Sequence, residues 1–327
     1  MATDSASKVR RWRRQRLVGT CAAVFLGLVL LLAAWGKALN PVAFVEQIRF
    51  EGLDFFGLAA PIAFLALALE IAIGMALLLG IRRLWVLIPA ALLVAFFLFL
   101  TGRTYWRFSQ GLLAETDACG CFGNLFVRTP AQAFWQDLGL LGLPMVLAFV
   151  GRPKPGGGPF PVVRTTLVGL VTVAGLLFAW KAPELPLDDL ATRLKPGVEV
   201  GELCAGSKAS DSRICLDALL TELETGRHRV VISNLDEPVF LDGVEHLNEL
   251  VYDGSDAGVW VLSGAPPEEV TAFGWTWAPT FEVREVPVAL LRPLFRRLPR
   301  SFVIEDGRVT HTFDGLPPAV ANPAGDV

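Results

Sequence analysis

Five long apolar segments constrain the fold of this chain more than any other feature of its sequence. They cover residues 17–39, 58–79, 84–100, 134–150 and 162–180. A helix of about 20 apolar residues crosses the roughly 30 Å hydrocarbon layer of a bilayer. Hydrophobic residues make up 53% of the chain and its mean hydropathy is +0.50, which is high for a soluble protein. The sequence therefore predicts a bundle of five membrane-spanning helices.

Charge divides the chain into two parts. Residues 1–185 carry 17 Lys and Arg against 9 Asp and Glu, whereas residues 186–327 carry 12 against 23. The dense basic run lies beside the first span, and the acidic part would repel phosphates, so nucleic acid is excluded as a partner. The lipid bilayer is the expected partner of the first part.

Basic residues also predict the orientation. They gather in residues 1–16, in the turn at 80–83 and in the loop at 151–164, which share one side if the spans alternate. Basic loops stay in the cytoplasm. We therefore expect a multi-pass protein of the inner membrane, with Trp35 and Lys37 at the membrane interface. The expected domains are a basic cytoplasmic tail (1–16), a four-helix membrane domain (17–151), a cytoplasmic loop, fifth helix and linker (152–185), and a periplasmic domain (186–327).

Four of the five cysteines form two close pairs, while Cys21 lies inside an apolar run. Cys119 and Cys121 belong to the sequence CGCFG in the loop before the fourth span. The glycine between them lets the backbone bend toward disulfide geometry. A strained, exposed disulfide is easily reduced, which is typical of catalytic pairs. A structural staple and a metal-ligand pair are the alternatives, but no nearby His or second cysteine pair completes a zinc set, and no metal site is predicted.

The acidic part alternates between strand-like and helical patterns. Strands are predicted at 229–234, 258–263 and 280–286, and helical spacing at 240–251, 266–275 and 287–297. Residues 301–313 predict a hairpin, because Asp306-Gly307 is a strong turn signal. This order predicts an α/β sheet with helices packed on it.

The order of these elements over residues 198–315 resembles the thioredoxin-like fold of the periplasmic TlpA type. The resemblance implies a cis peptide bond before Pro299, in the segment Leu298–Ile304. The CxxC motif of that family is absent, because its place after the first strand is taken by LDEPVF at 235–240. Cys204 and Cys215 lie upstream, where they would face each other in a hairpin. A structural disulfide, a redox pair exchanging with the Cys119/Cys121 loop, and two unpaired thiols are the alternatives.

The membrane part resembles the MauE/DoxX-type family of redox-associated membrane proteins. The resemblance rests on AAWGKALNPVAF, LALEIAIGMALLLGIRR, a third apolar span and CGCFG, in that order over residues 25–150. It implies a role in thiol–disulfide processes, including maturation of the cysteine-rich subunit of methylamine dehydrogenase. The fifth span and the fused acidic domain depart from the family pattern.

Glu70 is a carboxyl group in the middle of the second span, where a charge is costly and suggests a function. It is expected to be protonated, to hydrogen-bond between helices, or to relay protons for an acceptor such as a membrane quinone. No other cofactor is evident. The three histidines, His228, His246 and His311, are expected at the surface.

These features predict a membrane thiol–disulfide protein, an oxidoreductase if Cys119 and Cys121 cycle. Its partner would be a periplasmic client protein or a thioredoxin-like protein. The alternative is a non-enzymatic assembly or chaperone factor, favoured by the missing CxxC. A transporter has little support, because the five spans contain no internal repeat.

Overall fold

The computed structural model describes residues 2–111, 128–153, 162–205, 213–252 and 258–318. The chain divides into two compact units, residues 1–185 and 186–327, which are described separately below. Cys119 and Cys121 lie outside the described residues.

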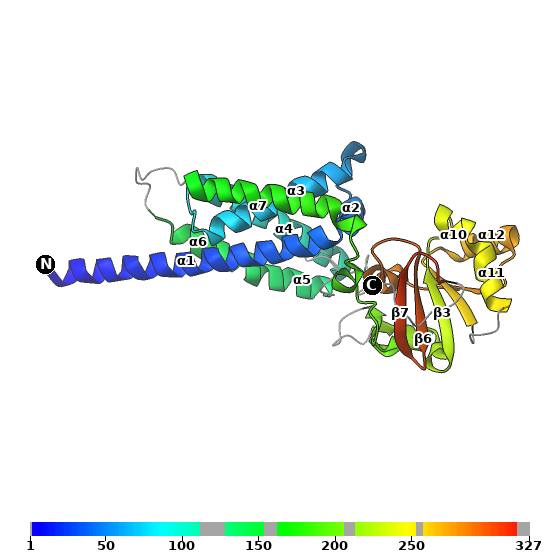
Figure 1. The fold of residues 1–327 in the computed structure, drawn as a ribbon. Coiled ribbons are helices and arrows are strands. Elements are labelled where there is room, and N and C mark those ends of the chain that lie inside the picture. The colour runs from blue at the N-terminus through cyan, green and yellow to red at the C-terminus, as the bar shows by residue number, and fades with distance from the viewer. Residues whose placement is uncertain (1, 112–127, 154–161, 206–212, 253–257, 319–327) are drawn as a thin grey trace. The chain divides into compact units, whose positions relative to one another are not determined.

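The first unit is helical (Figure 1). Its elements are α1 (Ala2–Leu39), α2 (Pro41–Phe50), η1 (Phe55–Gly57), α3 (Ala59–Leu78), α4 (Leu84–Ser109), α5 (Pro130–Asp137), the π-helical turn η3 (Leu138–Gly142), α6 (Leu143–Val150), α7 (Val162–Lys181) and η4 (Ala182–Glu184). Within the described part of the chain, five helical stretches are long and apolar enough to cross a membrane, the fourth being formed by α5, η3 and α6. The prediction of five spans is confirmed.

Local sequence explains where the first helices meet. Helix α1 ends at Leu39, and Asn40 caps α2 by accepting a 3.2 Å hydrogen bond from the Ala43 amide. Helices α1 and α3 approach closely at Gly27, where a Cβ atom would lie 2.6 Å from the Gly74 carbonyl oxygen. Glycine at this crossing therefore lets the two backbones pack together.

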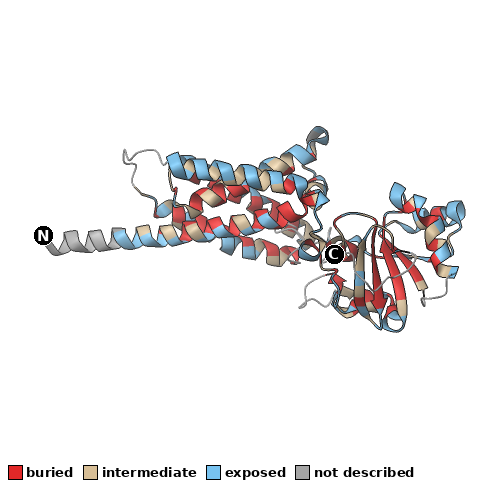
Figure 2. Ribbon diagram, in the orientation of Figure 1, coloured by how far each residue is buried: buried red, intermediate tan, exposed pale blue. Residues whose placement is uncertain are grey.

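Helix α7 is the least buried span. In Figure 2 most of its ribbon has the colour of exposed residues. Its contacts with α1 and α3 include Phe178, whose ring stacks on Trp35 with 5.3 Å between centroids, and Gly175, which lies against Ile71. A helix that is apolar on its exposed side suits a lipid environment.

The second unit contains two sheets. Its strands are β1 (Cys204–Ala205), β2 (Ile214–Cys215), β3 (Arg227–Ile232), β4 (Gly258–Ser263), β5 (Glu282–Glu285), β6 (Arg300–Glu305) and β7 (Arg308–Asp314). Its helices are α8 (Asp188–Ala191), η5 (Val200–Glu202), α9 (Leu216–Leu219), η6 (Thr221–Glu224), α10 (Pro238–Asp242), α11 (Val244–Tyr252), α12 (Pro267–Trp277), α13 (Val288–Leu291) and η7 (Arg292–Leu294). The larger sheet has the order β5-β4-β3-β6-β7, with β3, β4 and β5 parallel and β6 and β7 antiparallel to their neighbours.

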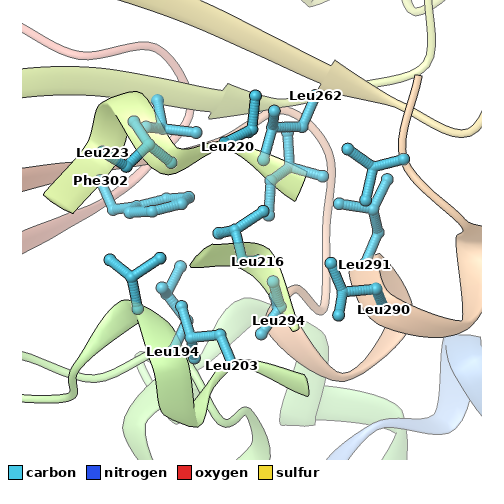
Figure 3. Close-up of a cluster of buried hydrophobic side chains, with 14 of the residues drawn as sticks. Leu194, Leu203, Leu216, Leu220, Leu223, Leu262, Leu290, Leu291, Leu294 and Phe302 are labelled. Atoms are coloured by element: carbon cyan, nitrogen blue, oxygen red, sulfur yellow. The ribbon is translucent and has the colours of Figure 1, made fainter. Parts of the chain in front are cut away.

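Side chains of the larger sheet alternate between two apolar cores. Val230 and Ile232 of β3 face one core, which Phe302 and a group of leucines fill (Figure 3), and Val231 faces the other, with Phe240. This alternation is the period of two expected for a strand that is covered on both faces.

The strand predictions for this unit are confirmed, and so are the hairpin and the cis bond. Asp306 and Gly307 have φ angles of 47° and 75°, as a type I′ turn requires, and the Leu298–Pro299 bond is cis. The helix predicted at 287–297 is wrong in length. It stops at Leu291 and continues only as the turn η7, because Pro293 has no N–H for a helical hydrogen bond.

Candidate functional site

The described residues include both ends of the loop that carries Cys119 and Cys121. Helix α4 precedes the loop and ends at Ser109, and the chain is described again from Arg128. Thr129 then starts α5 with a capping box, in which its hydroxyl accepts from the Gln132 amide and the Gln132 side chain accepts from the Thr129 amide. This cap begins the fourth span at Pro130, four residues before the predicted start.

Arg128 anchors this end of the loop inside the bundle. Its Nη1 atom donates a 2.8 Å hydrogen bond to Oδ1 of Asp137, and both side chains are buried. The π-helical turn η3 follows Asp137 directly, and such turns often mark functional positions. Because the Asp137 carboxylate pairs with the guanidinium, the charge of Arg128 is balanced within the bundle.

A second buried ion pair joins α1 and α3. The Lys37 ammonium donates to Oε1 of Glu70, and the side chains are 2% and 0% exposed. The ammonium also lies 4.9 Å from the ring centroid of Phe44 and 4.8 Å from that of Phe97. Aromatic faces attract cations, and the effect grows when water is excluded. Lys37, which the sequence placed at the membrane interface, turns its side chain into the bundle, where it neutralises Glu70.

Both ion pairs are buried in the helical unit, and we call their four residues the buried charge cluster: Lys37, Glu70, Arg128 and Asp137. Among the described residues, Oε2 of Glu70 and Oδ2 of Asp137 have no hydrogen-bond partner. A buried carboxylate oxygen without a donor is costly, so these two atoms are places where a proton or a water molecule would be stabilised.

A further buried carboxyl group, that of Glu51, lies in the segment between α2 and α3. Burial raises the pKa of the Glu51 carboxyl, and the positive charges of Arg103 and Arg107 on α4 oppose that rise. Glu51 thus approaches the last turns of α4, which lead into the loop with Cys119 and Cys121. The ion pair between Arg49 of α2 and Asp54 of this segment (3.5 Å) is more exposed.

In the second unit, Cys204 and Cys215 are bonded to each other. They are opposite each other in the antiparallel pair β1–β2, and their Cα atoms are 3.9 Å apart. Whether this disulfide is structural or takes part in exchange stays a prediction. The Arg193 guanidinium donates a 3.3 Å hydrogen bond to the Cys204 carbonyl, and burial lowers the pKa of that guanidinium.

A cavity opens where β3 and β4 end. Its volume is about 230 Å³, and its lining includes Ser233, Leu235, Pro266, Glu269 and Leu298. Ligands commonly bind at the carboxyl ends of parallel strands. The cavity adjoins the segment 235–240, which has no cysteine.

The histidines differ from expectation at one position. His228 is buried, and its Nδ1 accepts a 3.1 Å hydrogen bond from the Trp260 indole while Nε2 lies 2.8 Å from the Thr225 carbonyl. The indole can only donate, so Nε2 carries the proton and donates to Thr225. His311 is exposed, and His246 is half-buried. Within the described ranges, no group of three or more His, Cys, Asp or Glu side chains is placed to hold a metal ion.

Comparisons with known proteins agree with the helical bundle. The spans indicate a multi-pass membrane protein. Residues 15–150 match the model of the family described as Methylamine utilisation protein MauE. The match confirms the resemblance seen over residues 25–150 and ends before α7 and the second unit. No curated protein and no solved structure matches the chain. The DoxX and thioredoxin-like assignments therefore stay predictions.

The sequence identified Glu70 but not its partners. Lys37 and Asp137 are charged residues within or beside apolar helices, and that is the signal that would have found them. The Lys37–Glu70 pair depends on the packing of α1 against α3, whereas the Arg128–Asp137 pair joins the residue before the cap of α5 to the last residue of that helix.

Proposed function

We propose that this chain is a membrane thiol–disulfide protein of the methylamine-utilisation type, in which Cys119 and Cys121 cycle between dithiol and disulfide. The family match over residues 15–150 supports the class of process. The observation that carries the proposal is the Arg128–Asp137 pair, which fixes the end of the Cys119/Cys121 loop to a bundle containing the Lys37–Glu70 pair. A functional loop held by a rigid scaffold is a common arrangement.

The proposed reaction is thiol–disulfide exchange. A thiolate of one partner attacks a disulfide of the other, a mixed disulfide forms, and a second thiolate resolves it, so one disulfide breaks for each that forms. The substrate is a cysteine-containing periplasmic client or a thioredoxin-like partner. The chain would sit in the inner membrane with its N-terminus in the cytoplasm and residues 186–327 in the periplasm, where disulfides persist.

The buried charge cluster would serve this reaction by position and by proton balance. Arg128 is neutralised by Asp137, so its part is to anchor the loop. Glu70 and Lys37 would hold a proton inside the bundle. A membrane quinone is the proposed acceptor when the dithiol is reoxidised, since it takes the two electrons and two protons released as the disulfide forms.

Residues 186–327 would act as a thioredoxin-like binding module. Their cysteines are bonded to each other, and the segment after β3 has no thiol, so they contribute a surface rather than a dithiol. The cavity at the ends of β3 and β4 supports this part. The same observations favour the second candidate function, a non-enzymatic assembly or chaperone factor for a periplasmic enzyme.

Trapping separates the two candidates. In membranes, Cys119→Ser and Cys121→Ser should each leave one thiol that holds a client as a mixed disulfide, detected by non-reducing electrophoresis and mass spectrometry. Cys21→Ser is the control and should trap nothing. If neither loop variant traps a client and the double variant restores full function in cells, exchange is wrong and the assembly role remains.

A further inference from the structure

An apolar groove lies between α3, α4 and α7. Its volume is about 140 Å³, and its lining includes Ala72 and Ala76 of α3, Ile81 of the turn, Trp85 of α4, and Thr165 and Val168 of α7. Small side chains on α3 leave the space open, and an apolar groove on the side of a membrane bundle is open to lipid rather than to water.

The packing of α7 explains why the groove is at this end of the helix. The second half of α7 lies tightly against its neighbours: Ala179 is buried, Gly175 contacts Ile71 and Phe178 stacks on Trp35. Over residues 162–170, only Thr165 and Val168 are half-buried and the others are exposed. The first turns of α7 therefore border the groove without filling it.

Three arginines neighbour the lining residues of the groove in the sequence. Arg164 precedes Thr165, and its Nη1 atom donates a 3.2 Å hydrogen bond to the Leu79 carbonyl at the end of α3. Arg82 and Arg83 follow Ile81 in the turn before α4, and residues 72–92 and 162–172 contain these three arginines and no Asp or Glu. The mouth of the groove is thus cationic.

We propose that this groove binds one acyl chain of an anionic phospholipid, with the lipid phosphate at Arg83 and Arg164. Arginine suits a phosphate because its planar guanidinium presents several donors to the phosphate oxygens. Basic pockets between membrane helices bind anionic headgroups in this way. The groove binds the acyl chain, and the arginines favour a lipid with an anionic headgroup.

This site goes beyond the proposed redox function and does not depend on it. The family match ends at residue 150, so the α7 wall of the groove lies outside the matched segment. The fifth span would then have a definite part: it completes a lipid site against α3 and α4.

Native mass spectrometry of the full chain in detergent tests the proposal. Phosphatidylglycerol and phosphatidylcholine with the same acyl chains are added at equal concentration, and bound lipid is counted. The native protein should retain phosphatidylglycerol preferentially. Arg83→Gln and Arg164→Gln should each weaken its binding about fivefold without changing phosphatidylcholine binding. Arg152→Gln, at the end of α6, is the matched control and should change neither.

Two further measurements complete the test. Ala72→Phe fills the groove and should weaken both lipids, while thermal melting of the variant reports that it folds. Inorganic phosphate should neither displace the bound lipid nor raise the melting temperature as phosphatidylglycerol does. Equal retention of the two lipids by the native protein, unchanged phosphatidylglycerol binding in the arginine variants, or displacement by free phosphate would overturn the proposal.

Discussion

The two units handle buried charge in different ways. In the bundle, Lys37–Glu70 is sealed from solvent, with side chains 2% and 0% exposed. In the second unit, Arg300 is also buried, but its two carboxylate partners, Asp188 at 3.5 Å and Asp314, are 13% and 67% exposed. Burial lowers the pKa of Arg300, and Asp188 opposes that fall.

The exposure of the partners determines how much each ion pair contributes to stability. A carboxylate as exposed as Asp314 keeps most of its hydration, so its ion pair adds little to stability, whereas Asp188 keeps less of its hydration. A sealed pair has lost the hydration of both partners, and removing one partner leaves a charge that nothing solvates. The buried charge cluster therefore makes the bundle sensitive to single substitutions. In the second unit, Arg300 keeps one carboxylate when the other is removed, so a single substitution there should cost less.

The largest effect is expected at Glu70. Glu70→Leu leaves the Lys37 ammonium unpaired in the bundle and should lower the free energy of unfolding by about 3–5 kcal/mol. Reversible unfolding in mixed detergent micelles measures this change. The double variant Lys37→Met/Glu70→Leu removes both charges and should recover most of the loss. A double variant no more stable than Glu70→Leu would contradict the assignment of the loss to the pair.

Asp137 comes next. Asp137→Ala removes a charge-assisted hydrogen bond to Arg128 and should cost about 2–3 kcal/mol. Because Arg128 ends the Cys119/Cys121 loop, the variant should also slow exchange with a client disulfide, measured by quenched alkylation. Gln132→Ala, which disturbs the cap of α5, should cost about 1 kcal/mol and leave exchange nearly unchanged. If both variants lose exchange equally, the Arg128–Asp137 pair does not anchor the Cys119/Cys121 loop for this reaction.

A smaller effect is expected in the second unit. Asp188→Ala removes a mostly buried partner of both Arg296 and Arg300, each at 3.5 Å, and should lower stability by about 1–2 kcal/mol, because Arg300 keeps Asp314. Asp314→Ala removes a more exposed carboxylate and should cost less than that. Calorimetry of the full chain compares the two. A loss at Asp188 as large as at Glu70 would remove the distinction between the units.

The smallest effect concerns pH. Burial raises the pKa of Glu51 above its usual value of 4.5. The folded state therefore holds this proton more tightly than the unfolded state, and the contribution to stability is complete below pH 4.5 and lost as pH rises through the folded pKa. In the Glu51→Gln variant, the melting temperature should depend less on pH over that range. If the melting temperature of the variant changes with pH as steeply as that of the native protein, the pH dependence belongs to another group.

Much of the fold could be predicted because its signals are local. Long apolar runs gave the spans, and the Asp306-Gly307 turn and β-rich runs gave the sheet. The exceptions arise from contacts across the fold. The Lys37 side chain turns inward to Glu70. The His228 side chain is buried and accepts a hydrogen bond from Trp260. The helix after β5 ends early for a local reason, Pro293. Within the buried charge cluster the sequence identified Glu70 but not its partner Lys37, which comes from another helix, nor the pairing of Arg128 with Asp137 across α5.

The redox state of each cysteine in native membranes tests the central claim most directly. Differential alkylation with mass spectrometry, before and after mild reductant and then after addition of an oxidised client, separates the four paired cysteines. Mild reductant should reduce Cys119 and Cys121 to the dithiol, and their disulfide should form again as they reduce the client disulfide. Cys204 and Cys215 should stay bonded throughout. If Cys119 and Cys121 keep one state throughout, the chain does not perform thiol–disulfide exchange at this loop.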